Sequence, residues 1–348
     1  MPLINFPMNT FDFIILGAGA FGLATAAELR LSGHRVAVVA PKGEAASRVA
    51  AGMIAPAFEV AIDGLRAEQA QILKIGRVLW ADFATRTGVH LQHMPAEWRG
   101  EGADALAVVL ERNEFEYSYL PEHQWIVTEE DAKLDPEAAL DVLSEGVERI
   151  DALARSVRFE NDVWTVDYGT GTVSAPQLVV ATGAAAAIEG MPKDVTALIA
   201  RIIPIRGQIG ITHERLVDHV VRGPGAYIAP VNAGPYAGGA VVGATMEEGV
   251  RDLATDPELC GRMMEAAWAL LGHEPVEIDM EWRAGIRGAS PDGMPMAGPV
   301  GQGLHVALAP RRNGWLLAPL VAGQVVAGIE GLPLPEPALD PLRFNPSH

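Results

Sequence analysis

The segment "FIILGAGAFGLATAAELRL", residues 13–31, constrains the fold of this 348-residue chain more than any other feature. An apolar run is followed at once by glycines with G-x-G-x-x-G spacing and then by apolar residues at helical intervals. In such a strand–turn–helix the first glycine permits a tight turn, the second lets backbone approach a pyrophosphate, and the third allows close helix–strand packing. The sequence therefore predicts a dinucleotide site at Gly17, Gly19, Ala20 and Gly22, where the helix N-terminus faces the phosphates.

The hydrophobic pattern of the remaining chain predicts an α/β protein. Short apolar runs indicate buried strands, and these lie at 11–16, 35–40, 177–184 and 304–310. Longer segments with helical periodicity lie at 20–31, 63–87, 135–150, 256–271 and 313–329. Between residues 202 and 247, short strands alternate with Gly/Pro turns, which is typical of an antiparallel sheet. We expect irregular structure at 95–130 and an extended or disordered Pro-rich tail from residue 331.

The order of these elements predicts two domains. Elements of parallel sheet occur near the start, the middle and the end of the chain, so the nucleotide-binding domain is expected to be discontinuous. We predict a Rossmann-type cofactor domain of residues 1–94, 136–201 and 282–348. An antiparallel-sheet substrate domain is predicted for residues 95–135 and 202–281.

Charge and cysteine content narrow the classes of partner. The formal net charge of −18 disfavours binding to nucleic acid, because an acidic protein repels phosphate backbones. Cys260 is the only cysteine, which argues against an internal disulfide or a cysteine-rich metal site, and it suits a reducing cytosol. No apolar run approaches the ~20 residues that span a bilayer, and the N-terminal segment does not read as a secretory signal. We expect a soluble, cytoplasmic protein without a metal, and the sequence leaves a homo-oligomer open.

The predicted nucleotide site departs from the usual pattern at one position. An acidic residue about 20 residues after the glycines usually binds the ribose hydroxyls, but Ala40 occupies the end of the second strand. Glu44 follows in the next loop and could reach back, although a solvated loop charge is its simpler interpretation. Water or backbone groups are the other replacements. We expect the missing acid to change affinity rather than the identity of the cofactor.

A series of motifs resembles the D-amino-acid-oxidase family of flavoproteins, and most of all its glycine oxidase branch, the FAD enzymes of thiamine biosynthesis. The motifs occur in the family's order across residues 11–330. They are "GAGAFGLATAAELRLSGHRV", "AAGMIAP", "LVVATGA", "PIRGQ", "YIAP", "VVGATMEEG", "RAGIRGASPDGMPMAG" and "RRNGWLLAPLVAGQVV". Such a collinear series is much more specific than one short motif.

The resemblance implies non-covalent FAD, because no cysteine is placed for covalent attachment. The glycines of the first motif would hold the pyrophosphate, and the loop that begins at Ser47 would cradle the cofactor. Backbone amides along the isoalloxazine edge would come from Ala51, Gly52 and Met53. Gly183 would lie near the adenine side. The loop under the pyrimidine end of the ring would contain Arg312, Asn313 and Gly314.

The resemblance also implies a substrate site. Arg287 matches the arginine that forks onto the substrate carboxylate, Tyr227 the tyrosine that supports it, and Met246 an apolar wall of the pocket. The implied reaction is oxidation of a small amino acid or N-substituted glycine by hydride transfer from Cα to flavin N5. The product is an imine, with hydrogen peroxide where oxygen is the acceptor.

Structural roles are the alternatives for these residues: a surface ion pair for Arg287, an ordinary strand aromatic for Tyr227, and core packing for Met246. Three departures from the family pattern keep other functions open. Ala309-Pro310 replaces a Gly-His pair, Arg283 replaces a tryptophan, and a second tyrosine is missing near Arg222. The alternatives are a dehydrogenase that uses a quinone or partner acceptor, and a flavin-binding module without catalysis.

Overall fold

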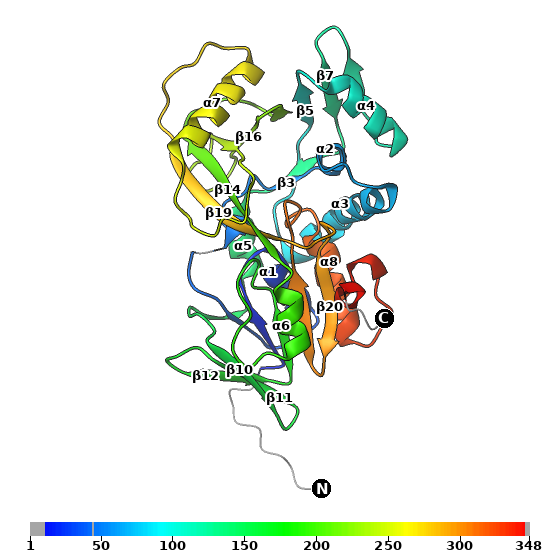
Figure 1. The fold of residues 1–348 in the computed structure, drawn as a ribbon, viewed down its shortest axis with the longest axis vertical. Helices are drawn as coiled ribbons and strands as arrows, with labels where there is room; N and C mark the ends of the chain where they lie inside the picture. The colour runs from blue at the N-terminus through cyan, green and yellow to red at the C-terminus, as the bar shows by residue number, and fades with distance from the viewer. Residues whose placement is uncertain (1–10, 44, 345–348) are drawn as a thin grey trace.

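A six-stranded, mostly parallel sheet forms the lower part of the molecule (Figure 1), as the computed structural model of residues 11–43 and 45–344 shows. Its four inner strands are almost entirely buried apolar runs, which is typical of parallel sheets covered on both faces, and its two edge strands are partly exposed. The strand order is β20 (Met296–Gly301), β21 (Leu304–Leu308), β13 (Gln177–Val180), β1 (Phe13–Leu16), β2 (Val36–Val39) and β9 (Glu148–Ile150). The mixed α/β fold predicted from the sequence is confirmed.

The residues of β1 alternate between two cores. Phe13 and Ile15 pack with the helical layer, whereas Ile14 and Leu16 pack with the opposite face. The helical layer contains α1 (Ala20–Leu31), α3 (Ala67–Thr87), α5 (Pro136–Leu143) and α8 (Ala318–Ile329). The opposite face is covered by α6 (Lys193–Ile199) and by the three-stranded sheet of β10 (Ser156–Glu160), β11 (Val163–Asp167) and β12 (Thr172–Ala175).

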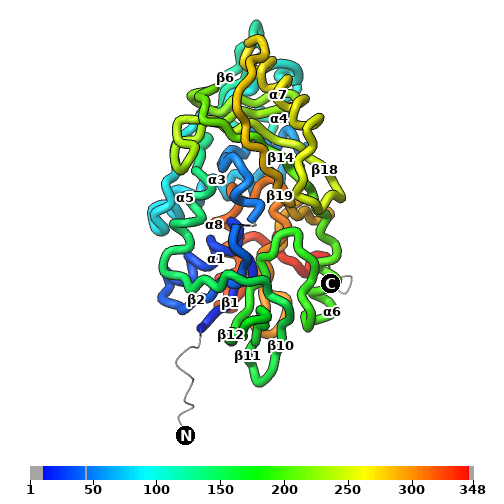
Figure 2. Tube along the Cα trace, turned by 90° about the vertical axis from the view of Figure 1, so that its left-hand side faces the viewer, coloured from blue at the N-terminus to red at the C-terminus, as the bar shows by residue number. Residues whose placement is uncertain are grey.

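A nine-stranded sheet, largely antiparallel, forms the upper part. Its strands are β5 (Ala96–Arg99), β6 (Ser118–Leu120), β7 (Trp125–Thr128), β14 (Ile203–Thr212), β15 (Val220–Gly223), β16 (Ala226–Pro230), β17 (Ala240–Gly243), β18 (Glu247–Glu248) and β19 (Glu281–Ala289). Helix α7 (Pro257–Leu271) packs on one core, and α2 (Pro56–Ile62) and α4 (Ala103–Arg112) on another. The long β14–β19 pair, from Ile203↔Ala289 to Ile211↔Glu281, runs down from this sheet toward the parallel sheet (Figures 1 and 2).

The structure also contains a fourth, small sheet. It consists of β3 (Met53–Ile54), β8 (Ala132–Lys133) and β4 (Gln92–His93). The remaining short elements are the 3-10 turns η1 (Ala46–Arg48), η2 (Pro337–Leu339) and η3 (Pro341–Phe344). Among the described helices, none is both long and apolar enough to cross a bilayer.

Some predicted elements are wrong in extent. The predicted helix 135–150 ends at Leu143, and strand β9 follows, because Gly146 turns the chain with φ +71°. The predicted helix 63–87 begins only at Ala67, and the shorter α2 precedes it. Residues 95–130 are not irregular, since they form β5, α4, β6 and β7.

The tail is also more ordered than predicted, up to residue 344. Leu339 is fully buried, and the Gln324 side chain makes hydrogen bonds to both the N–H and the C=O of Glu336. Arg343 pairs with Asp292 at 2.9 Å. The prolines therefore shape two short turns that pack on α8 and β20.

Close packing of α1 on β1 depends on the third glycine of the motif. A Cβ at Gly22 would lie 2.2 Å from the carbonyl oxygen of Gly17, so Gly22→Ala must push the helix off the strand. We expect this variant to lose about 1–3 kcal/mol of stability. The matched control is Gly261→Ala in α7, where a Cβ meets nothing within 4 Å and helix propensity gains roughly 1 kcal/mol. Thermal unfolding compares the two, and equal effects would contradict this account.

Candidate active site

The turn between β1 and α1 has the shape that the glycine motif predicts. Gly17 has φ +110°, and a Cβ there would lie 2.2 Å from the carbonyl oxygen of Ala181. Gly19 is the extended N-cap residue of α1, and its side-chain direction is open except for the Ser47 hydroxyl, 3.1 Å from an added Cβ. The backbone can therefore approach a ligand at the helix N-terminus, where free N–H groups favour a phosphate.

Ser47 links this turn to the rest of the site. Its hydroxyl accepts a hydrogen bond from the Ala20 N–H at 2.9 Å, and its carbonyl accepts one from the Trp315 indole at 3.1 Å. The buried hydroxyl of Thr182, which follows β13, has no protein partner among the described residues. An unpartnered buried hydroxyl beside a glycine turn is the kind of group that a polar ligand would satisfy.

The end of β2 keeps the departure seen in the sequence. Ala40 is 5% exposed, and its N–H donates to the Ile150 carbonyl at 3.1 Å. Glu44, the predicted replacement, lies outside the described residues. Gly183 has φ +64° and directs its carbonyl toward Gly288 of β19.

A cavity of about 340 Å³ brings together most of the other predicted site residues. This volume lies at the small end for ligand pockets and suits a small molecule. The predicted residues among its lining are Ala51, Gly52, Met53, Tyr227, Met246, Arg287, Arg312 and Asn313. Gly52 has φ +72°, and a Cβ there would lie 2.0 Å from the Leu134 carbonyl oxygen, so this position requires glycine.

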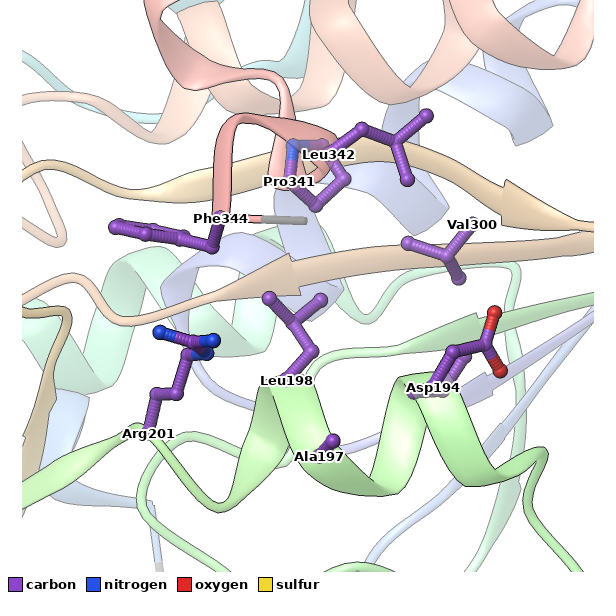
Figure 3. Close-up of a pocket in the computed structure, with 9 residues that line it drawn as sticks. Asp194, Ala197, Leu198, Arg201, Val300, Pro341, Leu342 and Phe344 are labelled. Atoms are coloured by element: carbon purple, nitrogen blue, oxygen red, sulfur yellow. The ribbon is translucent and has the colours of Figure 1, made fainter. Parts of the chain in front are cut away.

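A second cavity, of about 110 Å³, lies between α6 and η3 (Figure 3). Its lining is mostly apolar, and Asp194 and Arg201 lie toward its two ends. It contains none of the predicted site residues. We therefore place the candidate active site in the larger cavity.

Arg287 lies flat on the sheet because its neighbour has no side chain. A Cβ at Gly207 would lie 2.1 Å from the guanidinium of Arg287. Nη1 of Arg287 donates to the Thr245 carbonyl at 3.1 Å and lies 3.2 Å from the Met246 sulfur. In residues 11–43 and 45–344, Arg287 forms no ion pair with a carboxylate. Burial lowers its pKa, with Tyr227 opposing, but an arginine remains charged.

A second glycine in the sheet makes room for the Tyr227 side chain. Its phenol packs over Gly243 of β17, where an added Cβ would lie 2.3 Å from the hydroxyl oxygen. Burial raises the pKa of Tyr227, and the surrounding arginines oppose that effect. The phenol therefore stays neutral at pH 7 and can donate a hydrogen bond. Met246, the predicted wall residue, is 40% exposed at the rim.

A buried cluster of ionic groups, which was not predicted from the sequence, lies beside the cavity. Glu59 of α2 accepts hydrogen bonds at 2.6 Å from both Arg222 and Arg312. Asp63, one helical turn later, pairs with Arg312 at 3.1 Å and also with Arg311. The signal was present: two acids four residues apart in the apolar segment "PAFEVAID" share one face of a helix. Arg311, the neighbour of Arg312, is part of this cluster.

The arginines keep Glu59 ionised. Burial by itself would raise the pKa of Glu59, but the charges of Arg312 and Arg222 outweigh it and lower the pKa to about 2. At Asp63 burial and the charge of Glu59 prevail over the arginines, and the pKa is raised.

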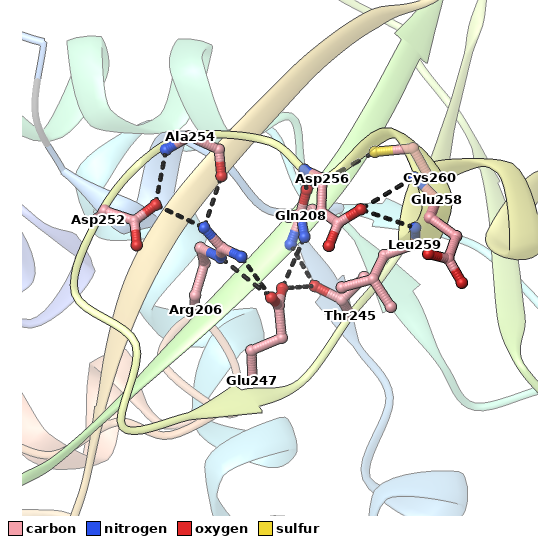
Figure 4. A network of polar contacts seen from close by, with 10 residues as sticks. All are labelled: Arg206, Gln208, Thr245, Glu247, Asp252, Ala254, Asp256, Glu258, Leu259 and Cys260. Atoms are coloured by element: carbon pink, nitrogen blue, oxygen red, sulfur yellow. Dashed lines mark hydrogen bonds and ion pairs between the residues drawn. The ribbon is translucent and has the colours of Figure 1, made fainter.

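A polar network holds the segment that carries Thr245 and Met246 (Figure 4). Glu247 accepts hydrogen bonds from Gln208 at 2.6 Å, from the Thr245 hydroxyl at 2.7 Å and from Arg206 at 2.5 Å. These bonds lower the pKa of Glu247 to about 2, the Arg206 bond most strongly. The network thus fixes the position of the Thr245 carbonyl, which accepts the hydrogen bond from Arg287.

Two other predicted or noted residues lie apart from the cavity wall. Arg283 pairs with Glu281 at 2.5 Å and with Glu137 at 3.0 Å, and it does not line the cavity. Gly314 follows the buried Asn313 and packs against Pro310.

Removal of the Glu59 charge should destabilise the protein in a pH-dependent way. Because the folded pKa of Glu59, about 2, lies below its ordinary value of 4.5, its stabilising effect is complete above about pH 4.5 and is lost as the pH falls toward 2. Glu59→Gln should therefore cost about 3–5 kcal/mol at pH 7 and converge on the native protein in acid. The measurement is denaturant unfolding across this pH range. Glu160→Gln, in an exposed pair with Arg158, is the control and should change little. A pH-independent difference for Glu59→Gln would contradict the assignment.

Comparisons with known proteins agree with this geometry. The bifunctional protein ThiO/ThiG of a Nostoc species is 28% identical over 351 residues, covering 91% of this chain and 52% of that protein. The chain thus spans about half the length of the first curated relatives that it matches. Glycine oxidase from Geobacillus kaustophilus has the same fold, with TM-score 0.78, 21% identity and coverage of 97% of this chain and 100% of that one. L-proline dehydrogenase from P. horikoshii gives TM-score 0.77 at 17% identity, covering 98% and 99%.

The family match extends over residues 12–328 and therefore over both large sheets and the cavity. FAD is the cofactor of this family, as the resemblance implied, and the glycine turn and the unpartnered Thr182 hydroxyl fit a dinucleotide. The chain belongs to the family of FAD dependent oxidoreductases.

Proposed function

We propose that this protein oxidises a small amino acid or N-substituted glycine with FAD as its cofactor. The observation that carries the proposal is the convergence of Arg287 and Tyr227 in one small cavity bordered by residues 51–53. Arg287 is a half-buried cation that forms no ion pair with a carboxylate in the described part of the chain. A substrate carboxylate would satisfy it.

The two side chains would fix the substrate through its carboxylate. A guanidinium binds a carboxylate with two parallel hydrogen bonds, which sets both position and orientation. The neutral phenol of Tyr227 would donate a third. Because Thr245 and the surface of Gly207 hold the guanidinium in place, the substrate would be oriented before reaction. Such orientation supplies a large share of the rate enhancement.

The residues for the cofactor lie on both sides of Ser47. Gly17, Gly19 and Ala20 would hold the pyrophosphate, and residues 51–53 with Arg312 and Asn313 would border the flavin ring. When bound, FAD accepts the hydride equivalent from the substrate Cα, which leaves an imine that water hydrolyses. The protein supplies binding, orientation and charge.

Among the described residues that line the cavity, none is suited to act as a general base. Glu59 is held ionised by two arginines and its pKa is lowered to about 2, so it is a weak proton acceptor at pH 7. Tyr227 remains protonated because burial raises its pKa. The substrate would therefore react with its amine already neutral, and activity should rise with pH as the amine loses its proton.

Arg287→Leu tests the carboxylate site. We expect the variant to keep its flavin but to lose at least about 100-fold in kcat/KM, mainly through KM, because a charge-assisted bidentate contact is removed. Anaerobic flavin bleaching across glycine, sarcosine and D-amino acids measures this. Arg283→Leu, on the same strand but outside the cavity, is the matched control and should keep the native values. An unchanged kcat/KM in Arg287→Leu would reject the proposal.

The acceptor is tested separately. We expect oxygen to accept the electrons and hydrogen peroxide to form in an amount equal to the substrate oxidised. The unusual Ala309-Pro310 pair, with Ala309 at φ +59°, lies just before the loop proposed for the ring, so this point needs direct measurement. Flavin that reoxidises only with a quinone or dye would instead indicate a dehydrogenase.

A further inference from the structure

Positive charge exceeds negative charge in the lining of the larger cavity. Three arginines line it, Arg222, Arg287 and Arg312, whereas Glu59 is the only acid in the lining that is described. Glu59 is shared between Arg222 and Arg312. Beyond the lining, Asp63 is shared between Arg311 and Arg312. A substrate with a single carboxylate would occupy Arg287 and leave this excess.

Like Arg312, whose Nε has no partner, Arg222 has a free donor among the described residues. Its side chain is almost fully buried, with the residue 5% exposed. Nη2 donates to Glu59 at 2.6 Å, but Nη1 is buried without a hydrogen-bond partner among the described residues. The guanidinium also lies 5.8 Å from the centre of the Phe58 ring, which limits its movement. Because buried donors in folded proteins are nearly always paired, this N–H group indicates a missing acceptor.

A protein carboxylate does not supply that acceptor. Asp131 is the other acid that interacts with Arg222, and it is buried and hydrogen-bonded to Thr128. Burial raises the pKa of Asp131 to about 7, with Thr128 and Arg222 opposing. It is therefore only partly ionised at neutral pH. Because Arg222 lines the cavity and its Nη1 is unpaired, a ligand in the cavity is the acceptor that we infer for this N–H group.

The sheet places Arg222 beside the carboxylate site. Arg222 of β15 is the register partner of Tyr227 of β16, and Tyr227 is in turn the partner of Gly243 of β17. Neighbouring strands lie about 4.8 Å apart, so Arg222 is one strand away from the phenol. In strand order Tyr227 thus lies between Arg222 on one side and Arg287 on the other, and all three residues line the same cavity.

We propose that the preferred substrate is a small amine with two carboxylates, either an acidic amino acid or an N-carboxyalkyl glycine. The proposal rests on the proposed function. Arg287 and Tyr227 bind the carboxylate next to the reacting carbon, and Nη1 of Arg222 binds the second carboxylate. Arg222 is therefore a specificity-determining residue, and it lies near the place where the family resemblance leads one to expect a second tyrosine.

Binding of inert carboxylates tests the second site without turnover. The holoenzyme is titrated with succinate and with butanoate, which have the same number of carbons, and flavin absorbance reports occupancy. We expect succinate to bind about 10- to 100-fold more tightly, the effect of one buried charge-assisted hydrogen bond. Arg222→Gln should remove most of this difference. Arg99→Gln is the control. Arg99 lies on β5, the strand next to β15, where it pairs with Glu97 of the same strand, and it does not line the cavity.

Substrate preference completes the test. Anaerobic flavin reduction compares D-aspartate with D-alanine, and N-(carboxymethyl)glycine with N-ethylglycine. The native protein should favour a diacid, and the diacid-to-monoacid ratio of kcat/KM should fall at least about tenfold in Arg222→Gln, with partial retention in Arg222→Lys. An equal loss for both substrate types in Arg222→Gln, or a native protein that prefers monoacids and binds butanoate as well as succinate, would overturn the proposal. Tight succinate binding without reduction by any amine would support the second site and count against the proposed function alone.

Discussion

The carboxylate of Glu59 is the interaction on which the cavity depends. It connects three segments that are far apart in the sequence: helix α2, strand β15 through Arg222, and the loop after β21 through Arg312. Two arginines brought this close would repel each other strongly in a buried setting, and the shared carboxylate offsets that repulsion. The wall of the cavity can therefore carry several cations and still fold. Its positive character is a property of the cluster and not of any one residue.

Backbone positions without side chains give the site its shape. Gly17 and Gly22 bring α1 close to β1, and Gly207 and Gly243 leave the sheet surface free for Arg287 and Tyr227. A Cβ added at any of these four glycines would lie within 2.3 Å of the group that the glycine accommodates. The functional side chains lie flat against the sheet, and this limits their rotamers before a ligand arrives.

Features that depend on local sequence were predictable, and those that depend on distant contacts were not. The strand–glycine–helix unit follows from neighbouring residues, and helix α1 has the predicted bounds, 20–31. The family resemblance indicated Arg287 and Tyr227, which both line the cavity, and their roles remain proposals. Glu59 and Asp63 were missed because an acid in an apolar helix is explained only by arginines from β15 and the loop before α8. The tail was mistaken for disorder because its prolines conceal the burial of Leu339.

The glycines under Arg287 and Tyr227 affect how this site can change during evolution. A methyl group at Gly207 or Gly243 would close the space that the functional side chain occupies, so these positions cannot serve to alter specificity gradually. Arg222 and the rim residue Met246 instead contribute side chains to the cavity lining, and Arg222 also pairs with Glu59. A library of variants for new substrates should therefore vary Arg222 and Met246 and keep both glycines. Within one wall of the cavity, the positions with side chains can therefore change, whereas the glycine positions cannot.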